Sequence, residues 1–173
     1  MHHLWFRKLR SADWFGGGAP VDELLKERFE GDLAMMAQAR AASFLDDPRT
    51  ALAAVLLFDQ VPRNLYRGSA RAFLYDPLAR SIVYGALHRG WDRMLTPPER
   101  QFLYMPLMHS EDIADQELSL ALFRRLPRRF GWSFARSHHR MIARFGRFPH
   151  RNGVLGRGST AAEKRAVAAG FNW

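Results

Sequence analysis

The sequence predicts an all-α fold, with six to seven antiparallel helices in one domain, residues 1–173. Capping residues and prolines that begin helices recur along the chain, while the alternation of apolar and polar residues that marks strands does not. The connections between the expected helices are short, and short connections place neighbouring helices antiparallel. A chain of 173 residues is also of a length that one domain accommodates.

The first half of the chain is expected to hold two long helices. A helix of about five turns begins at Asp22, because apolar residues follow it at helical spacing. Asp47 and Pro48 are an N-cap and a first-turn proline, and they open the apolar run Ala51–Phe58. Pro62 is expected to kink or end this helix, since proline cannot donate to the carbonyl four residues earlier.

Further start signals follow in the second half. Asp76 and Pro77 repeat the cap signal and open a helix that Gly90 ends. Residues 96–99 and 160–163 each place Thr three residues before Glu, which is the spacing of a capping box. Each box predicts the first turn of a helix.

The remaining elements lie between the two boxes or after them. Ser, Glu and Asp at 110–112 begin a helix that runs to about Leu126, with acids where the helix dipole favours them. Residues 132–144 form another helix. Residues 145–158 hold four glycines and a proline without periodicity, which predicts a loop. A loop of this length is commonly functional. Gly170 ends the last short helix.

Composition indicates a folded protein and is compatible with a reducing compartment. The chain is 47% apolar and 13% aromatic, and it has no cysteine for a disulfide or a thiolate nucleophile. Its first residues include only three apolar residues in a row, and no apolar run approaches the ~20 residues that cross a membrane. We expect a soluble, cytoplasmic protein that does not contact a membrane.

Positive charge is concentrated in one segment. No acid occurs between Glu117 and Glu163, whereas ten arginines do. Without those ten, the 26 basic residues of the chain fall to 16, against 17 acidic ones. The net charge of +9 therefore originates in this arginine-rich segment, which requires an acidic counterpart. That counterpart is the protein's own carboxylates, a small anion or a nucleic acid.

The first candidate segment follows the apolar run and contains Asp59, Gln60, Arg63, Asn64 and Arg67. Spacing of four residues places Asp59 beside Arg63, and Arg63 beside Arg67, on a helix. One interpretation is structural, with a helix ion pair and two amides that secure the kink. The other is that the kink directs these side chains into a cavity, where they bind a ligand.

The second candidate segment holds His109, Glu111 and Asp115 in the most acidic part of the chain. Helix capping accounts for the acids, and an acid/base pair of His109 and Glu111, or a Glu111 that orients a loop arginine, is the functional alternative. The chain has no His-Glu-x-x-His motif and no Glu-x-x-His pair, so we expect no metal and no cofactor.

The third candidate segment joins a helix to the long loop. Arg136, Arg140 and Arg144 form a stripe at four-residue spacing, which is typical of a solvated helix face. The loop alternates cationic groups with phenylalanine, glycine and proline, a pattern that predicts a rigid site for an anion. The residues assigned to a site here are His139, Arg144, Arg147, His150, Arg151 and Asn152.

Together these segments resemble a bacterial family known as domain of unknown function 924. The resemblance is carried by WFGG near residue 14, DQVPRNLYRGSARAF at 59–73, MPLMHSEDIADQE at 105–117 and HHRMIARFGRFPHRNGVLGRGST at 138–160. It covers nearly the whole chain in order. It implies a tetratricopeptide-like helical array and brings no established activity.

Two functions are favoured. The first is a pocket for a small anionic ligand, a phosphate or carboxylate metabolite, in which Glu111 and proton transfer by His109, His139 or His150 allow catalysis. It requires that the three segments converge, so that late arginines neutralise carboxylates from the middle of the chain. The alternative is a helical-hairpin scaffold for an acidic peptide. We do not expect a nucleic-acid partner, because no recognised binding module occurs.

Overall fold

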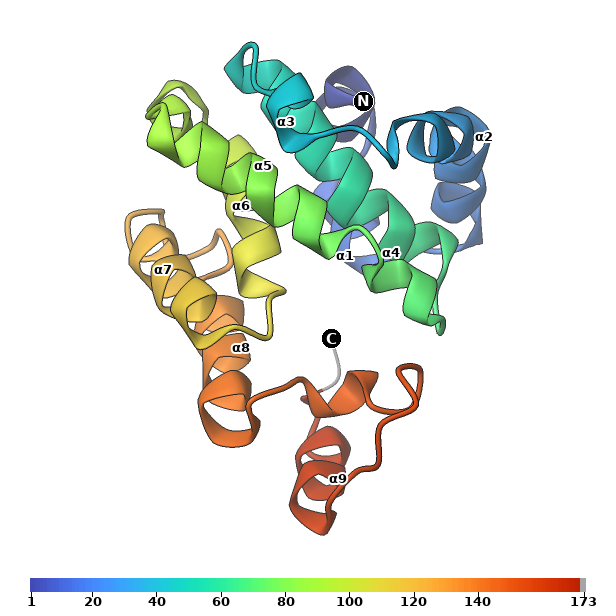
Figure 1. The fold of residues 1–173 in the computed structure, drawn as a ribbon, viewed down its shortest axis with the longest axis vertical. Coiled ribbons are helices and arrows are strands. Elements are labelled where there is room, and N and C mark those ends of the chain that lie inside the picture. The colour runs from blue at the N-terminus through green and yellow to red at the C-terminus, as the bar shows by residue number, and fades with distance from the viewer. Residues whose placement is uncertain (172–173) are drawn as a thin grey trace. The chain divides into compact units, whose positions relative to one another are not determined.

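The computed structural model describes residues 1–171, and every regular element in that range is helical (Figure 1). This part of the chain contains nine α-helices and no strand, so the all-α prediction is confirmed and the expected number of helices was too low. None of the described helices has the length and apolar character needed to cross a membrane. The residues separate into two compact units, Met1–Leu103 and the chain from Tyr104 onward. The prediction of a single domain stays a prediction.

The first unit contains five complete α-helices and the beginning of a sixth. Short 3-10 or π segments lie between them, and the π segments span Leu4–Lys8 and Leu56–Gln60. The α-helices are α1 (Ser11–Gly16), α2 (Ala19–Met36), α3 (Pro48–Val55), α4 (Val61–Leu65), α5 (Asp76–His88) and α6 (Pro97–Met108), which continues into the second unit.

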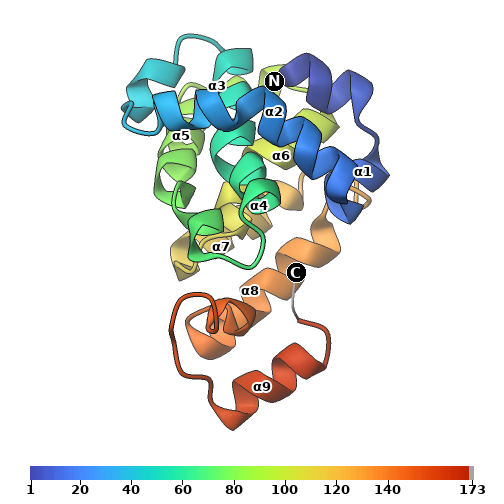
Figure 2. The ribbon, with the colours of Figure 1, turned by 90° about the vertical axis from the view of Figure 1, so that its right-hand side faces the viewer.

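Two helix pairs and an aromatic cluster form the core of the first unit. Helix α3 packs against α5, and α2 packs across α4 (Figure 2). Val55, Phe58 and Ile82 are fully buried in this layer. Trp5 and Phe102 meet edge to face at a centroid distance of 5.5 Å, which joins the N-terminal π segment to α6. Apolar burial of this kind is the main stabilising contribution to the fold.

The second unit is built from α7 (Ile113–Phe123), α8 (Trp132–Phe145) and α9 (Ala161–Ala168). Helices α7 and α8 pack along each other. A small apolar core of Met141, Ile142, Phe148 and Ala166 joins α8, the loop after it and α9. The predicted loop is therefore anchored by Phe148, which is fully buried, and it includes one 3-10 turn, Pro149–Arg151.

Most of the predicted helix starts agree with the structure. Asp47 accepts hydrogen bonds from the backbone N–H groups of Arg49 and Thr50, at 2.8 and 3.1 Å. Thr160 and Glu163 form the complete capping box expected for α9. Pro62 does not end the helical path, because the π turn Leu56–Gln60 absorbs the proline and α4 follows directly.

Asp76 is a correction. It lies in the first turn of α5 and does not cap it, since Tyr75 is the N-cap residue and has no side-chain cap bond. The Asp76 carboxylate instead binds Arg63. A cap signal in sequence cannot reveal that a distant guanidinium competes for the same carboxylate.

Candidate functional site

The first candidate segment forms a buried ionic network inside the first unit. Arg63 lies between two carboxylates, because its Nη1 is 3.1 Å from Asp59 Oδ1 and its two terminal nitrogens donate to Asp76 at 2.9 Å. Gln60 Nε2 donates to Asp59 Oδ2 at 2.6 Å. Burial by itself would lower the pKa of Arg63, but attraction to Asp59 and Asp76 raises it above its ordinary value.

Arg67 and Asn64 extend this network toward α2. Arg67 donates to both oxygens of Asp22, at 3.0 and 3.1 Å, and to Asn64 Oδ1 at 2.9 Å. Gly17 has a φ of +55°, and a Cβ there would collide with the Arg67 guanidinium. The glycine motif near residue 14 therefore leaves room for an arginine of the second motif. In the first unit, both arginines of the candidate segment have carboxylate partners.

Glu111 binds the loop of the second unit. It accepts two hydrogen bonds from Arg157, at 2.7 and 2.9 Å, and one from the backbone N–H of Phe148 at 2.7 Å. Burial by itself would raise the pKa of Glu111, but these bonds lower it below its ordinary value. Glu111 thus orients a loop arginine, and that arginine is Arg157. The neighbouring Asp112 supplies the N-cap of α7.

A second ion pair secures the other end of the loop. Arg147 donates to Glu163 at 2.6 and 3.0 Å and to the carbonyl of Gly158 at 2.9 Å. The Arg147 hydrogen bond is the main reason why the pKa of Glu163 falls to about 2. Asn152, which is fully buried, donates to Ser159 Oγ at 3.0 Å. The loop is thus fixed on both sides of Phe148.

Two histidines and an arginine surround the Phe148 ring, and a third histidine lies beside one of them. The centroids of His138 and His150 lie 5.3 and 5.6 Å from that of Phe148, and the Arg151 guanidinium lies 4.5 Å above the ring. His109 is 6.1 Å from His138, measured between ring centroids. We call His109, His138, His150 and Arg151 the histidine cluster. Its members come from the end of α6, from α8 and from the loop.

The histidine cluster disfavours additional positive charge. Burial is the first cause that lowers the pKa of His138, to about 3, and the neighbouring His109 and Arg151 lower it further. Burial also lowers the pKa of His150 to about 4, with Arg151 as the next cause, while Glu111 opposes the shift. Both imidazoles are therefore neutral at pH 7.

The hydrogen bond of His138 assigns its tautomer. Nδ1 lies 2.9 Å from the carbonyl oxygen of Phe134, so Nδ1 carries the proton and donates it. The lone pair of the neutral ring is then on Nε2, which can accept a hydrogen bond or a proton. The helical spacing of Ala135, His138 and Ile142 signalled a buried face, but the sequence argument assigned no role to His138.

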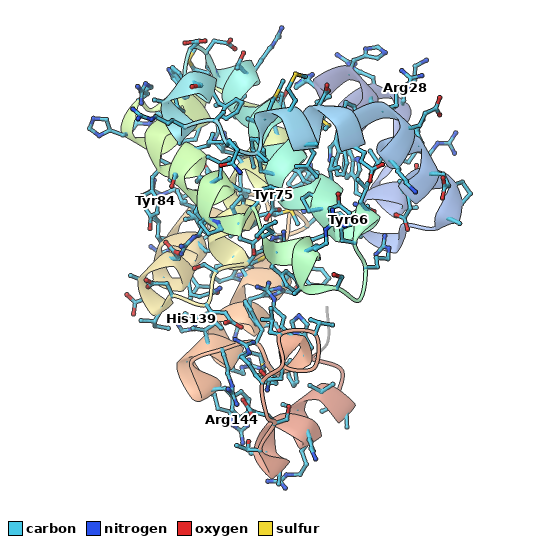
Figure 3. The ribbon with its side chains drawn as sticks, turned by 45° about the vertical axis from the view of Figure 1, so that its right-hand side comes forward. Arg28, Tyr66, Tyr75, Tyr84, His139 and Arg144 are labelled. Atoms are coloured by element: carbon cyan, nitrogen blue, oxygen red, sulfur yellow. The ribbon has the colours of Figure 1, made fainter. Side chains whose placement is uncertain are left out.

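His139 and Arg144, both labelled in Figure 3, lie outside the histidine cluster. His139 is half-buried on α8 and makes no ring contact or side-chain hydrogen bond with other described residues. Arg144 is exposed, with its guanidinium 5.0 Å from the centroid of Phe145. Arg136 and Arg140 are exposed as well. The roles assigned to His139 and Arg144 stay predictions.

The geometry joins the second and third candidate segments through Glu111, Phe148 and Arg157. The expected convergence of the first segment with them stays a prediction. Within residues 1–171, no group of three or more histidine, aspartate or glutamate side chains is placed to hold a metal ion. The chemistry available in the histidine cluster is hydrogen bonding, charge stabilisation and proton transfer by imidazole.

Comparison with known proteins places the chain in a family. The model of the family described as "Bacterial protein of unknown function (DUF924)" matches residues 1–170. A solved structure, that of the protein of unknown function ATU0120 from Agrobacterium tumefaciens, is similar with a TM-score of 0.90 and 36% sequence identity. The similarity covers 95% of this chain and 93% of that one. No curated protein matches. The histidine cluster and its two ion pairs therefore occur in a chain that belongs to the DUF924 family of bacterial proteins.

Proposed function

We propose that the second unit binds a small anionic ligand, a phosphate or carboxylate metabolite, at the histidine cluster. The observation that carries this proposal is that two imidazoles and a guanidinium surround one buried phenyl ring, with a third imidazole, His109, beside His138. Glu111 favours the protonated form of His150, whereas Arg151 and His109 oppose it. A bound anion would add negative charge beside these groups.

The ion pairs at the two ends of the loop have a positioning role in this proposal. Glu111 with Arg157, and Arg147 with Glu163, hold the backbone on both sides of Phe148. A binding constellation requires such rigid support, because small displacements weaken each contact. Arg151 and His150 then contact the anion, and Arg147 acts through the loop.

The two neutral imidazoles make a catalytic form of the site chemically reasonable. A neutral histidine at pH 7 can accept a proton, and burial places the pKa of His138 and His150 below neutrality. His109, the third imidazole, is buried and adjacent to His138. An acid/base reaction on a bound phosphate or carboxylate would use these rings as the proton carriers, in a cytoplasmic protein that needs no cofactor.

Inorganic phosphate and succinate are suitable first probes. The histidine ring signals are followed by NMR during titration, at several pH values. Binding is expected to raise the pKa of His150, because an adjacent anion stabilises the imidazolium, so affinity grows as pH falls toward the pKa of the ligand-free ring, about 4. Arg151→Gln is expected to weaken binding about tenfold, the loss of one charge-assisted contact.

Arg144→Gln is the matched control, since Arg144 is an exposed arginine at the end of α8. It removes the same charge from the same unit and is expected to leave affinity unchanged. His150→Asn gives a second test that keeps all arginines. Equal affinity of wild type, Arg151→Gln and His150→Asn for both probes would refute the proposal.

A second candidate function is a scaffold that binds an acidic peptide in a tetratricopeptide-like helical array. One observation favours it: Arg136, Arg140 and Arg144 are exposed along one side of α8, and none forms an ion pair with an acid among the described residues. Fluorescence anisotropy with a labelled oligoglutamate peptide tests this function. Binding that Arg140→Glu abolishes supports the scaffold, whereas salt-dependent binding of single-stranded DNA would indicate a nucleic-acid partner instead.

A further inference from the structure

The first unit contains a cavity of about 420 Å³ that none of the candidate segments lines. Arg7 of the π segment Leu4–Lys8 and Arg49 of α3 contribute cationic groups to it. Met94 and Pro48 contribute apolar surface, and Asp47 and Glu99 contribute carboxylates. Ligand pockets for small metabolites commonly have this size and this combination of apolar wall and few polar groups.

The two carboxylates of the cavity are already engaged. Asp47 caps α3 and also accepts a hydrogen bond from Thr50 Oγ1 at 2.5 Å. Glu99 accepts from His2 Nε2 at 2.6 Å, and from the backbone N–H and hydroxyl of Thr96 at 2.8 and 2.6 Å. Their acceptor oxygens are directed toward the protein, so they offer little to a ligand.

The guanidinium groups of Arg7 and Arg49 form no side-chain hydrogen bond or ion pair with another described residue, and both are exposed. The charge of Arg49 contributes least among the causes that lower the pKa of Asp47. Each guanidinium has five N–H donors in a planar arrangement that matches a carboxylate or a phosphate. The cavity therefore holds unused donors on one side, while its own acceptors are occupied.

Met94 defines the other part of the ligand. Its side chain is 73% exposed at the cavity, although it is large and apolar. The flexible thioether of methionine adapts to apolar and aromatic surfaces. An occupant that covers Met94 and Pro48 removes this apolar surface from water.

We propose that this cavity binds a small organic anion, whose carboxylate or phosphate lies against Arg7 and Arg49 and whose hydrocarbon or aromatic body covers Met94. The site is separate from the histidine cluster, which belongs to the second unit. Either site can exist without the other. Phenyl phosphate is the probe, because it joins one phosphate to one aromatic ring.

Methionine methyl groups distinguish the two sites by NMR. The chain has seven methionines. Met94 lies at the cavity, and Met141 packs beside Phe148, the ring that the histidine cluster contacts. Phenyl phosphate is expected to shift the Met94 methyl signal in a saturable manner and to perturb the ring signal of His2. Binding at the histidine cluster would shift Met141 instead.

Arginine variants identify the anion contacts. Arg7→Ala and Arg49→Ala are each expected to weaken the Met94 response about fivefold, as expected for one exposed charged contact. Arg28→Ala is the control, because Arg28 is an exposed arginine of α2 that does not line the cavity (Figure 3). It is expected to leave the response unchanged. All three residues are exposed, so the variants should fold.

Two results would overturn the proposal. One is the absence of a saturable shift of the Met94 methyl signal up to about 10 mM phenyl phosphate. A dissociation constant above that concentration would be weaker than those of most metabolite sites. The other is a response that Arg7→Ala and Arg49→Ala leave intact, or that inorganic phosphate reproduces with equal affinity. Equal affinity for inorganic phosphate would show that the apolar wall takes no part in binding.

Discussion

The two units use arginine and carboxylate in different ways. In the first unit, Arg63 lies between Asp59 and Asp76, and the more exposed Arg67 pairs with Asp22. These charges therefore neutralise one another within the unit. In the second unit, two ion pairs hold the ends of a loop that contributes His150 and Arg151 to the histidine cluster. Arginine–carboxylate pairs thus stabilise the packing of helices in the first unit, whereas in the second unit they position a loop beside titratable histidines.

The largest expected loss of stability concerns the buried ion pairs of Arg63. Arg63→Met removes the guanidinium from between two carboxylates, one of which, Asp59, is fully buried. We expect a loss of about 3–5 kcal/mol in the free energy of unfolding, the usual result of removing one partner of a buried ion pair. Urea denaturation measures it. Arg67→Met, at a more exposed pair, should cost at most about 1 kcal/mol. Equal losses of unfolding free energy in the two variants would contradict the distinction between the buried ion pairs of Arg63 and the more exposed pair of Arg67.

The next effect concerns the pH dependence of the second unit. His138 has a pKa of about 3 when folded and an ordinary value of 6.5, so the unfolded chain binds its proton first. Stability therefore falls as pH decreases from 6.5 toward 3. His138→Gln should reduce this slope by about 1.4 kcal/mol per pH unit, or about 3 kcal/mol at pH 4. Denaturant unfolding of both proteins between those pH values measures this difference. If stability depends on pH equally in His138→Gln and wild type, the lowered pKa of His138 is contradicted.

A smaller effect is expected at Glu111. Glu111→Gln replaces the carboxylate that accepts from Arg157 and from the Phe148 N–H group with a neutral amide. Weakening these charge-assisted bonds should cost about 1–3 kcal/mol. It should also broaden the ring signals of His150 in NMR spectra, because the loop loses one anchor. Sharp, unshifted His150 signals in a destabilised variant would mean that Glu111 stabilises the unit without positioning the cluster.

The smallest effect concerns the second anchor of the loop. The pKa of Glu163 is about 2 when folded and 4.5 ordinarily, so its contribution is complete above pH 4.5 and is lost as pH falls toward 2. Thermal melting should show Glu163→Gln less stable than wild type at neutral pH. The difference should shrink steadily below pH 4.5. A difference that stays constant down to about pH 3 would assign the effect to packing of the side chain.

Local signals predicted much of the fold. The Asp47 cap, the Thr160–Glu163 capping box and the extent of α8 depend on residues within a few positions of one another, so they can be read from the chain. The π turn before Pro62 could not be read in this way. Its geometry depends on how the surrounding helices accommodate a missing N–H group.

The sequence did not show which charged residues pair with one another. The absence of acids between Glu117 and Glu163 indicated that the arginines there need acidic partners from elsewhere. One of the alternatives left open, that Glu111 orients a loop arginine, agrees with its hydrogen bonds to Arg157. The sequence did not single out Arg157 as the partner of Glu111, and Asp76 was expected to cap a helix instead of binding Arg63. Each of these choices joins residues at least 13 positions apart, and spacing on a single helix carries no information about them.

By itself the sequence determined that the protein is helical, where most helices begin, and that its excess charge lies in one segment. Those properties follow from local hydrogen bonding and composition. Only the tertiary structure decided which carboxylate meets which guanidinium, and that His138, His150 and Arg151 surround Phe148. Such contacts depend on the burial of distant side chains in a shared apolar core, where one phenyl ring brings together groups that the chain order keeps apart.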